Sequence, residues 1–427
     1  MSKWRHKIIV LVAACMLLSA CTARESTSVS APLQEEDNQE NGQVLTVVNP
    51  ETAKSEDTAV ESSKKKYQIQ TRLTDFHLLT ETTGIAWGIT RGELRLYTTN
   101  DQGRTWTNIS PAATVQFPGL VRYGEEMFFL DQGHGWIMRK AQGSTEGILL
   151  HTEDGGLNWK ISSLPANASP SSVYFTTAER GWLISVSPTS PGNQKKSVYN
   201  TYDGGSTWVA SKDEVVSSGQ TGSLINLPQY GYFADMDFTT EQQGFALIQE
   251  IKKPDLYTTK DGGQHWMQSN TFFRKQDLGE CDSYTAEQIQ FFNESGQTGL
   301  IPIRCTKGDT SKYSGYFTSD GAATFQFIDF PLPWQSGVNA GLAPYFVNEM
   351  EGWSLQGYLL YHTIDQGKTW RALPENRKLA TTLDDYPEVV KLQFVSPNYG
   401  WMLVQNSEER TSRLLSTHDG GLSWQML

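Results

Sequence analysis

Few residues of this chain have the types and spacing that catalysis or metal binding would need. Four of the seven histidines lie in or beside a short repeated motif, and they are His151, His265, His362 and His418. Because each belongs to a different copy of the motif, we do not expect them to share a metal ion, which needs several ligands around one point. The sequence therefore predicts no metal site and no cofactor.

Two short stretches look like catalytic motifs but do not match them fully. The triplet at 367–369, Gly-Lys-Thr, resembles the end of a phosphate-binding loop, but position 362 is His where that loop needs Gly. Asp384 and Asp385 are adjacent carboxylates, and adjacent residues of an extended strand point to opposite faces. They do not form an acid–base pair by themselves, so we expect a solvated loop and keep both as binding candidates.

The N-terminus carries a targeting signal. Lys3, Arg5 and Lys7 precede an apolar run of eleven residues, 8–18. This run is shorter than the roughly 20 residues of a membrane-spanning helix and fits a signal peptide. It ends in Leu-Ser-Ala-Cys at 18–21, which resembles the lipobox of bacterial lipoproteins. That resemblance implies that residues 1–21 are a signal and that lipidated Cys21 becomes the first mature residue, held at a membrane outside the cytoplasm.

Residues 22–66 are expected to be a disordered tether. They contain no Trp, Tyr or Phe, so they cannot bury enough apolar surface to offset the entropy of ordering. Residues 67–427 differ, because they hold all but one of the 13 tryptophans. The net charge of the whole chain is −12, which argues against nucleic acid as a partner, because such proteins carry a basic stripe.

An eight-residue pattern, Thr-x-Asp-x-Gly-x-x-Trp, recurs along residues 67–427 and determines the predicted fold. It begins at 99, 152, 201, 259, 318, 363 and 417, and its aspartates are Asp101, Asp154, Asp203, Asp261, Asp320, Asp365 and Asp419. The copy at 318 is degenerate, with Ala322 for Gly and Phe325 for Trp. Steps of 45 to 59 residues separate successive aspartates, which is the period of a repeat protein.

A second signal, Gly followed by an aromatic residue, lies upstream of most copies, as at 135–136, 181–182, 352–353 and 400–401. Short β-patterned runs flank it, so each period holds four short strands. Four strands in about 50 residues are typical of a blade of a β-propeller. We therefore predict an all-β, seven-bladed β-propeller over 67–427, with four antiparallel strands per blade and the octapeptide at the turn between the third and fourth.

The octapeptide resembles the Asp box, or BNR repeat, of bacterial sialidases and related propellers. That resemblance implies a structural turn, on the face away from any ligand. Its residue types fit this role, because the Asp can accept hydrogen bonds from its own turn and the Gly can adopt a positive φ. The lipobox, the single-propeller size and the two repeated motifs together resemble the photosystem II assembly and stability factor-like propellers. Those relatives imply a non-enzymatic scaffold.

A carbohydrate-active propeller, binding or cleaving glycan, is the alternative. Sialidases usually carry an Arg within a Phe-Arg-Ile-Pro-like motif ahead of their Asp boxes, and this chain has none. Phe273-Arg274-Lys275 lacks the Pro and falls mid-propeller, and Arg304 within 302–305 also departs from the motif. We therefore expect a monomeric, non-enzymatic scaffold at the cell envelope, which binds a protein or an envelope polymer and is attached to the membrane through its lipid.

The face opposite the octapeptide turns should carry the long loops, at 211–232, 268–285, 329–340, 372–387, 187–197 and 306–314. Loops of such length are uncommon unless they have a function. Cys281 and Cys305 both fall on this face, and we predict a disulfide between them, with two buried thiols as the alternative. Trp334 is the one mature tryptophan that the repeats do not explain. We predict that it forms a binding surface with Tyr386, unless its ring folds back into the channel or a gap between blades.

Overall fold

The computed structural model describes residues 42–48, 66–140, 146–165, 169–211, 223–224, 226–274, 279–292 and 295–427. The predicted signal peptide, the lipidation candidate Cys21 and most of the predicted tether lie outside these residues. No helix within the described ranges is long and apolar enough to cross a membrane.

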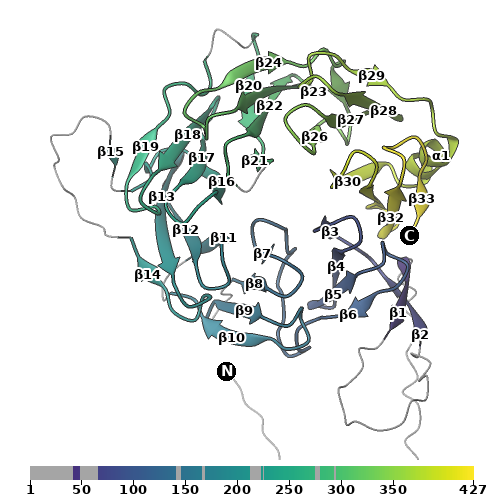
Figure 1. Cartoon of the computed structure of the whole chain (residues 1–427), viewed down its shortest axis with the longest axis horizontal. Helices are drawn as coiled ribbons and strands as arrows, with labels where there is room; N and C mark the ends of the chain where they lie inside the picture. The colour runs from purple at the N-terminus through teal and green to yellow at the C-terminus, as the bar shows by residue number, and fades with distance from the viewer. Residues whose placement is uncertain are drawn as a thin grey trace, which may run out of the picture. The chain divides into compact units, whose positions relative to one another are not determined.

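The predicted seven-bladed β-propeller is confirmed. Each blade is an antiparallel sheet whose strands follow chain order, with the first strand nearest the centre of the ring (Figure 1). Blades 1 to 3 consist of β3 (Asp75–Leu78), β4 (Gly84–Thr90), β5 (Glu93–Thr99) and β6 (Thr107–Asn108); β7 (Met127–Phe129), β8 (Gly135–Arg139), β9 (Ile148–Thr152) and β10 (Lys160–Ser163); and β11 (Pro170–Phe175), β12 (Gly181–Ser190), β13 (Asn193–Thr201) and β14 (Val209–Ala210).

Blades 4 to 7 repeat this plan with additions in blades 4 and 5. They consist of β15 (Ser223–Leu224), β16 (Tyr232–Phe238), β17 (Gly244–Gln249), β18 (Pro254–Thr259) and β19 (Trp266–Gln268); β20 (Ser283–Ala286), β21 (Gln290–Phe291), β22 (Gly299–Lys307), β23 (Thr310–Thr318), β24 (Gln326–Asp329) and β25 (Gln335–Ser336); β26 (Tyr345–Phe346), β27 (Gly352–Gln356), β28 (Leu359–Thr363) and β29 (Arg371–Ala372); and β30 (Glu388–Phe394), β31 (Gly400–Asn406), β32 (Thr411–Thr417) and β33 (Gln425–Met426). Here β15 pairs outside β19, and β25 pairs with the start of β23.

Each octapeptide forms a turn whose polar groups bond to one another. In blade 3, the Thr201 hydroxyl donates to Asp203 Oδ1 (2.8 Å) and accepts from the Gly205 amide (2.9 Å). Thr207 donates to the same carboxylate through its amide (2.9 Å) and its hydroxyl (2.6 Å). Gly205 has φ +89°, and a Cβ there would lie 2.4 Å from a Leu149 methyl. The polar groups of the turn thus satisfy one another, and Gly takes the positive φ, as predicted; in the degenerate copy Ala322 adopts φ +62° at the same position.

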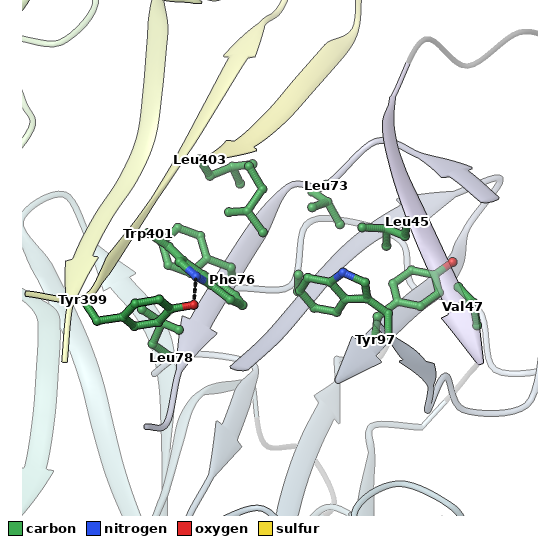
Figure 2. Packing of buried hydrophobic residues seen from close by; sticks show 12 residues of the cluster. Leu45, Val47, Leu73, Phe76, Leu78, Tyr97, Tyr399, Trp401 and Leu403 are labelled. Carbon is green, nitrogen blue, oxygen red and sulfur yellow. Dashed lines mark hydrogen bonds between the residues drawn. The ribbon is translucent and has the colours of Figure 1, made fainter. Parts of the chain in front are cut away.

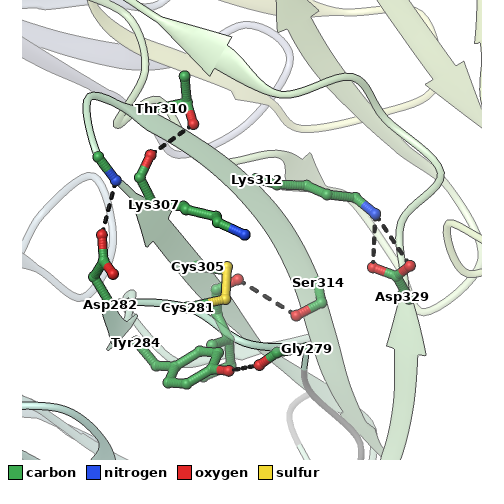
Figure 3. Close-up of a disulfide and its surroundings, with 12 residues drawn as sticks. Gly279, Cys281, Asp282, Tyr284, Cys305, Lys307, Thr310, Lys312, Ser314 and Asp329 are labelled. Carbon is green, nitrogen blue, oxygen red and sulfur yellow. Dashed lines mark hydrogen bonds and ion pairs between the residues drawn. A yellow bond between two sulfur atoms is a disulfide. The ribbon is translucent and has the colours of Figure 1, made fainter.

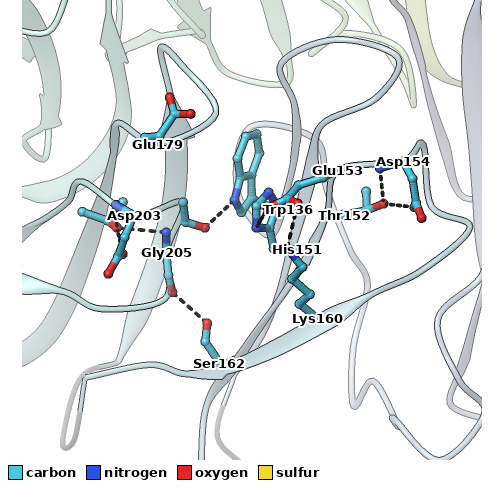
Figure 4. Close-up of polar contacts among 12 residues, drawn as sticks. Trp136, His151, Thr152, Glu153, Asp154, Lys160, Ser162, Glu179, Asp203 and Gly205 are labelled. Atoms are coloured by element: carbon cyan, nitrogen blue, oxygen red, sulfur yellow. Dashed lines mark hydrogen bonds and ion pairs between the residues drawn. The ribbon is translucent and has the colours of Figure 1, made fainter.

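The tryptophans of the Gly-Trp pairs hold neighbouring blades together. In three blades the indole is fully buried, stacks on a phenylalanine of the next blade and donates to a glycine carbonyl in that blade's octapeptide turn. The stacked pairs are Trp136–Phe175, Trp182–Phe238 and Trp353–Phe394, with centroids 3.7, 3.7 and 3.9 Å apart. Their acceptors are Gly204, Gly262 and Gly420, each at 2.9 Å. Figure 4 shows Trp136 between the turns of Asp154 and Asp203.

A strand lies within the segment expected to be a disordered tether. β1 (Gln43–Val48) pairs antiparallel with β2 (Lys66–Thr71), and β1 also packs on blades 1 and 7. Leu45 and Val47 are buried in the hydrophobic cluster between blades 7 and 1. We call such an interface between neighbouring blades a seam. Figure 2 shows them with Tyr97 and Trp401 in that cluster. For these residues the expectation was wrong, because the alternating side chains of β1 find apolar partners on the ring.

A helix, α1 (Arg377–Asp385), lies within the long connection between blades 6 and 7. Asn376 caps it by accepting from the Leu379 amide (2.9 Å), which satisfies one of the free donors at a helix start. Leu379 and Leu383, one turn apart, are buried on one side. The expected loop around Asp384 and Asp385 is therefore the last turn of a helix.

Candidate functional site

The two faces of the ring carry different connections. Because the strands of a blade alternate in direction, the octapeptide turns share one face with the turns between first and second strands. We call this the lower face. The connections from second to third strands, and those between blades, lie on the opposite, upper face. The described parts of the predicted long loops, and α1, belong to these upper-face connections, as predicted for the loops; residues 212–222, 225 and 275–278 of those loops lie outside the described residues.

Trp334 is presented to solvent on the upper face. Its side chain is 46% exposed, although it follows Phe330 and Leu332, which are both buried. The next residue, Gln335, pairs with Ser311 of β23 and donates to the Leu355 carbonyl of blade 6 (3.0 Å). The ring is thus held out by a loop fixed at both ends. It does not fold back to plug the channel, which was the alternative considered from the sequence.

The loop that carries Trp334 is joined to the segment that carries Tyr386. The Asn339 side chain donates to the Pro387 carbonyl and accepts from the Val389 amide, both at 2.9 Å. Next to Asn339, Val338 is 72% exposed. Tyr386 is partly buried against the core of blades 6 and 7, with the Arg413 guanidinium 5.1 Å from its ring. The two loops are therefore neighbours, but Tyr386 contributes mainly packing.

The adjacent carboxylates lie beside this aromatic surface. Asp384 and Asp385 are exposed at the end of α1. Tyr358, in the tight turn between β27 and β28, is 50% exposed, and a hydrogen bond with Asp384 raises the pKa of its hydroxyl. Loop 330–342, turn 357–358 and α1 therefore form one framework. We call its exposed residues the upper-face patch, which comprises Trp334, Val338, Tyr358, Asp384 and Asp385.

Covalent and polar braces hold the two longest hairpins of the upper face. Cys281 and Cys305 form a disulfide, the predicted pairing, with Cα atoms 5.6 Å apart. It ties the chain before β20 to the hairpin β22–β23, where the Gly308 amide also donates to Asp282 Oδ2 (2.8 Å). Figure 3 shows this corner of blade 5. These bonds fix the hairpin that pairs with the segment after Trp334.

Lys196 braces the hairpin β12–β13 in another way. Its side chain is 2% exposed, and the three N–H groups of Nζ are shared among four backbone carbonyls, of Gln194, Pro228, Tyr230 and Gly231, at 2.8 to 3.1 Å. Burial lowers the pKa of this ammonium to about 8. The contact joins blade 3 to the start of blade 4. Sequence reasoning did not identify it, because the acceptors are backbone atoms distant in sequence.

The first strands, which lie nearest the centre of the ring, carry several ionisable groups. Lys391 of β30 approaches Asp75 Oδ1 of β3 (3.4 Å) and donates to the Phe76 carbonyl (2.8 Å). His77 stacks on Tyr123, with centroids 3.5 Å apart. Burial and the charge of Lys391 lower the pKa of His77 well below its usual value. The imidazole is therefore neutral at pH 7 and serves as an aromatic partner of Tyr123.

Two further carboxylates lie on β16 without a cation partner among the described residues. Asp235 and Asp237 are two apart on one strand, so both point to the same side. Desolvation raises the pKa of Asp235 to about 7 and that of Asp237 to about 6. Asp235 Oδ2 accepts from the Ile289 amide (2.9 Å), and Tyr174 hydrogen bonds to Asp237. Sequence reasoning missed this pair, whose only signal was the alternation of Asp235, Met236 and Asp237.

The described residues contain no cluster of three or more His, Cys, Asp or Glu side chains that could hold a metal ion. Two arrangements remain that could act on another molecule. One is the upper-face patch, which offers exposed apolar and acidic groups for binding. The other is the carboxylate pair of Asp235 and Asp237, whose raised pKa values place one or both near their titration point at neutral pH.

No family model matches this sequence, and no curated protein matches it. Among solved structures, YCF48 from Cyanidioschyzon merolae is 18% identical and covers 81% of this chain and 95% of its own, with a TM-score of 0.50. YCF48 bound to D1 peptide is 17% identical over 81% and 91% (TM-score 0.49). The GH93 α-L-arabinofuranosidase of Fusarium graminearum with arabinobiose is 11% identical over 70% and 94% (TM-score 0.40).

These likenesses concern the fold. YCF48 is a photosystem II assembly factor, so the solved structures that resemble this chain include the family that its repeats resemble. A fold of this kind hosts unrelated functions. The function must therefore be argued from the surface of this chain itself.

Proposed function

We propose that this chain is a non-enzymatic scaffold that binds a partner protein through the upper-face patch. The observation that carries the proposal is the exposure of Trp334 on a loop whose two ends are fixed. Tryptophan is the residue type most enriched among interface residues that dominate binding energy. A fixed loop loses little conformational entropy when the ring is covered by a partner.

The composition of the patch indicates the kind of partner. Trp334, Val338 and Tyr358 offer apolar surface, and Asp384, which is hydrogen bonded to Tyr358, adds exposed negative charge together with Asp385. An apolar centre with a charged rim is the usual anatomy of a protein interface. The partner that fits is a protein segment with an apolar side chain flanked by Lys or Arg.

We further propose that the scaffold lies outside the cytoplasm and is attached to a bacterial membrane through lipidated Cys21. The support for this part is the apolar run at 8–18 followed by Leu-Ser-Ala-Cys, a sequence pattern only. Metabolic labelling with a lipid analogue tests it. Incorporation should be abolished in Cys21→Ser and unchanged in Cys15→Ser, and label retained in Cys21→Ser would contradict the anchor.

The binding proposal is tested by crosslinking the full chain to its partner in isolated membranes. Trp334→Ala should lower the yield of the crosslinked adduct at least about tenfold, which corresponds to about 1.4 kcal/mol. The matched control is Ile364→Ala, because Ile364 is 66% exposed on the lower face of blade 6. Equal adduct yields from wild type and Trp334→Ala would contradict the proposal.

A carbohydrate-active propeller is the second candidate, and the Asp235–Asp237 pair favours it. Glycoside hydrolysis uses two carboxyl groups, one of them kept protonated by a raised pKa. The purified mature chain should be assayed for turnover of sialyl and cell-wall glycosides. Turnover that disappears in Asp235→Asn and in Asp237→Asn would favour the enzyme over the scaffold.

A further inference from the structure

β1 is a short strand that occupies a binding site on the ring, between blades 7 and 1. We call this site the seat of β1. The residues of β1 pair with β2 and contact strands of two blades, β6 of blade 1 and β32 of blade 7. Gln43, Leu45 and Val47 point inward and are 3%, 1% and 0% exposed. Val44 points outward and is 49% exposed. The ring therefore buries every second side chain of β1, as proteins do when they bind an extended peptide.

Polar contacts fix the register of β1 on its seat. The Thr46 carbonyl accepts from the Trp106 amide (2.9 Å), and the Val48 amide donates to the Trp106 carbonyl (2.8 Å). Gln43 accepts from the Leu414 amide (3.1 Å) and donates to the Leu427 carbonyl. Contacts with both ends of the strand thus come from blade 1 and blade 7, which are 308 residues apart at Trp106 and Leu414.

The seam under β1 departs from the three regular seams. Trp401 of blade 7 donates to Tyr399 of its own blade (2.7 Å) instead of to the turn of blade 1. Its ring is tilted by 54° against Phe76 at 5.7 Å, so the coplanar stack is missing. Leu45 and Val47 pack into this looser cluster. Figure 2 shows both side chains at the seam.

The seat also has room beside the strand. A cleft of about 390 Å³ runs between β1 and β33, with Val44, Arg104, His418 and Met426 among its lining residues. A strand with larger outward side chains than those of β1 can therefore be accommodated. Shape and contacts both describe a site for an extended segment.

We propose that the seam between blades 7 and 1 is a peptide-binding site for an extended segment of the pattern Gln-x-Leu-x-Val, and that residues 42–48 are its ligand, bound in cis. Recognition comes from two apolar pockets two residues apart, from the Leu414 amide and the Leu427 carbonyl that bind the Gln side chain, and from backbone pairing with β2 on one side and with Trp106 on the other. The site is separate from the upper-face patch, so either proposal can fail without the other.

The test is binding of a fluorescein-labelled synthetic peptide of residues 42–48 to the full mature chain. In Leu45→Asp/Val47→Asp the cis strand should leave its seat, and the labelled peptide should bind with a Kd on the order of 10 µM. In wild type the seat is filled at an effective concentration of about 1 mM, so the peptide should bind about 100-fold more weakly.

The matched control is Val44→Asp, on the outward side of the same strand, which should bind the peptide as weakly as wild type. If the double Asp variant does not fold, Leu45→Ala/Val47→Ala provides the same titration. A peptide carrying Asp at both inward positions should not bind. No peptide binding to a folded, β1-disabled variant would overturn the proposal, as would equally tight binding to that variant and to wild type.

Discussion

The lower and upper faces of this propeller differ in how their polar groups are satisfied. On the lower face, each octapeptide carboxylate is bonded within its own turn, as Asp203 is by Thr201 and Thr207. The same arrangement occurs in all seven copies. On the upper face, the loops are bonded to one another at their bases and leave Trp334, Val338 and Tyr358 exposed.

The difference separates two kinds of requirement. In a repeated turn, the polar groups bond to one another and none is left to recognise a partner. The role of the turn is to connect two strands and to accept a hydrogen bond from the tryptophan of the preceding blade. A surface that occurs once, with an exposed ring on a fixed loop, is suited to binding. Substitutions on the two faces should therefore affect different measurements.

The largest expected effect is that of Trp182→Ala, between blades 3 and 4. The substitution removes a fully buried ring, its stack on Phe238 and its bond to Gly262. The free energy of unfolding in urea should fall by about 3–5 kcal/mol. Tyr202→Ala is the control, because Tyr202 lies on the same Arg180 guanidinium but is 65% exposed. Similar losses in both variants would show that the seams are not the main source of stability.

An effect of opposite sign is expected for Asp235→Asn on β16, the innermost strand of blade 4. The folded-state pKa of Asp235 is about 7, above the unfolded value of about 3.9. Its ionisation therefore destabilises the fold, and stability falls as pH rises from about 4 to 7. Asp235→Asn should raise the melting temperature at pH 8 and leave it unchanged at pH 4, in thermal scans at both pH values. A melting temperature lowered at pH 8 would contradict this account.

Asp203→Ala should cost less than the seam substitution, about 1–2 kcal/mol, because it leaves turn donors without their acceptor. Partial burial raises the pKa of Asp203, but the hydrogen bonds from Thr207 lower it by more, so the pKa lies below its usual value. Its contribution is thus present above about pH 4 and lost as pH falls further. The free energy of unfolding in urea should change less between pH 7 and pH 3 for Asp203→Ala than for wild type. Glu408→Ala, which removes an exposed carboxylate of blade 7, should behave as wild type.

The repeats predicted the fold because their physics is local. Thr, Asp and Gly at fixed spacing specify a turn in each copy, and seven copies specify seven blades whatever the loops contain. The Cys281–Cys305 pairing followed from where those blades place the two residues. The exposure of Trp334 was predicted as one of two outcomes, since its proline-containing loop has no counterpart in the repeats.

What the sequence did not reveal depends on contacts between distant segments. β1 lies in a stretch without aromatic residues, and its burial comes from a seam formed by blades 1 and 7. The run of Val44, Leu45, Val47 and Val48 was the one available signal. α1 was missed within a long connection, although Leu379 and Leu383 have helical spacing. Burial in the folded ring raises the pKa values of Asp235 and Asp237, and that burial is not visible in the sequence around them.

The most direct test of the account measures stability and partner binding on the same two variants. Trp334→Ala should keep the wild-type melting temperature within about 1 °C, because an exposed surface residue contributes little to folding, and should lose the crosslinked partner. Asp203→Ala should melt at a lower temperature and, below that temperature, recover the partner as wild type does. A Trp334→Ala protein that binds normally, or an Asp203→Ala protein that is fully stable but does not bind, would contradict the assignment of folding to the lower face and binding to the upper.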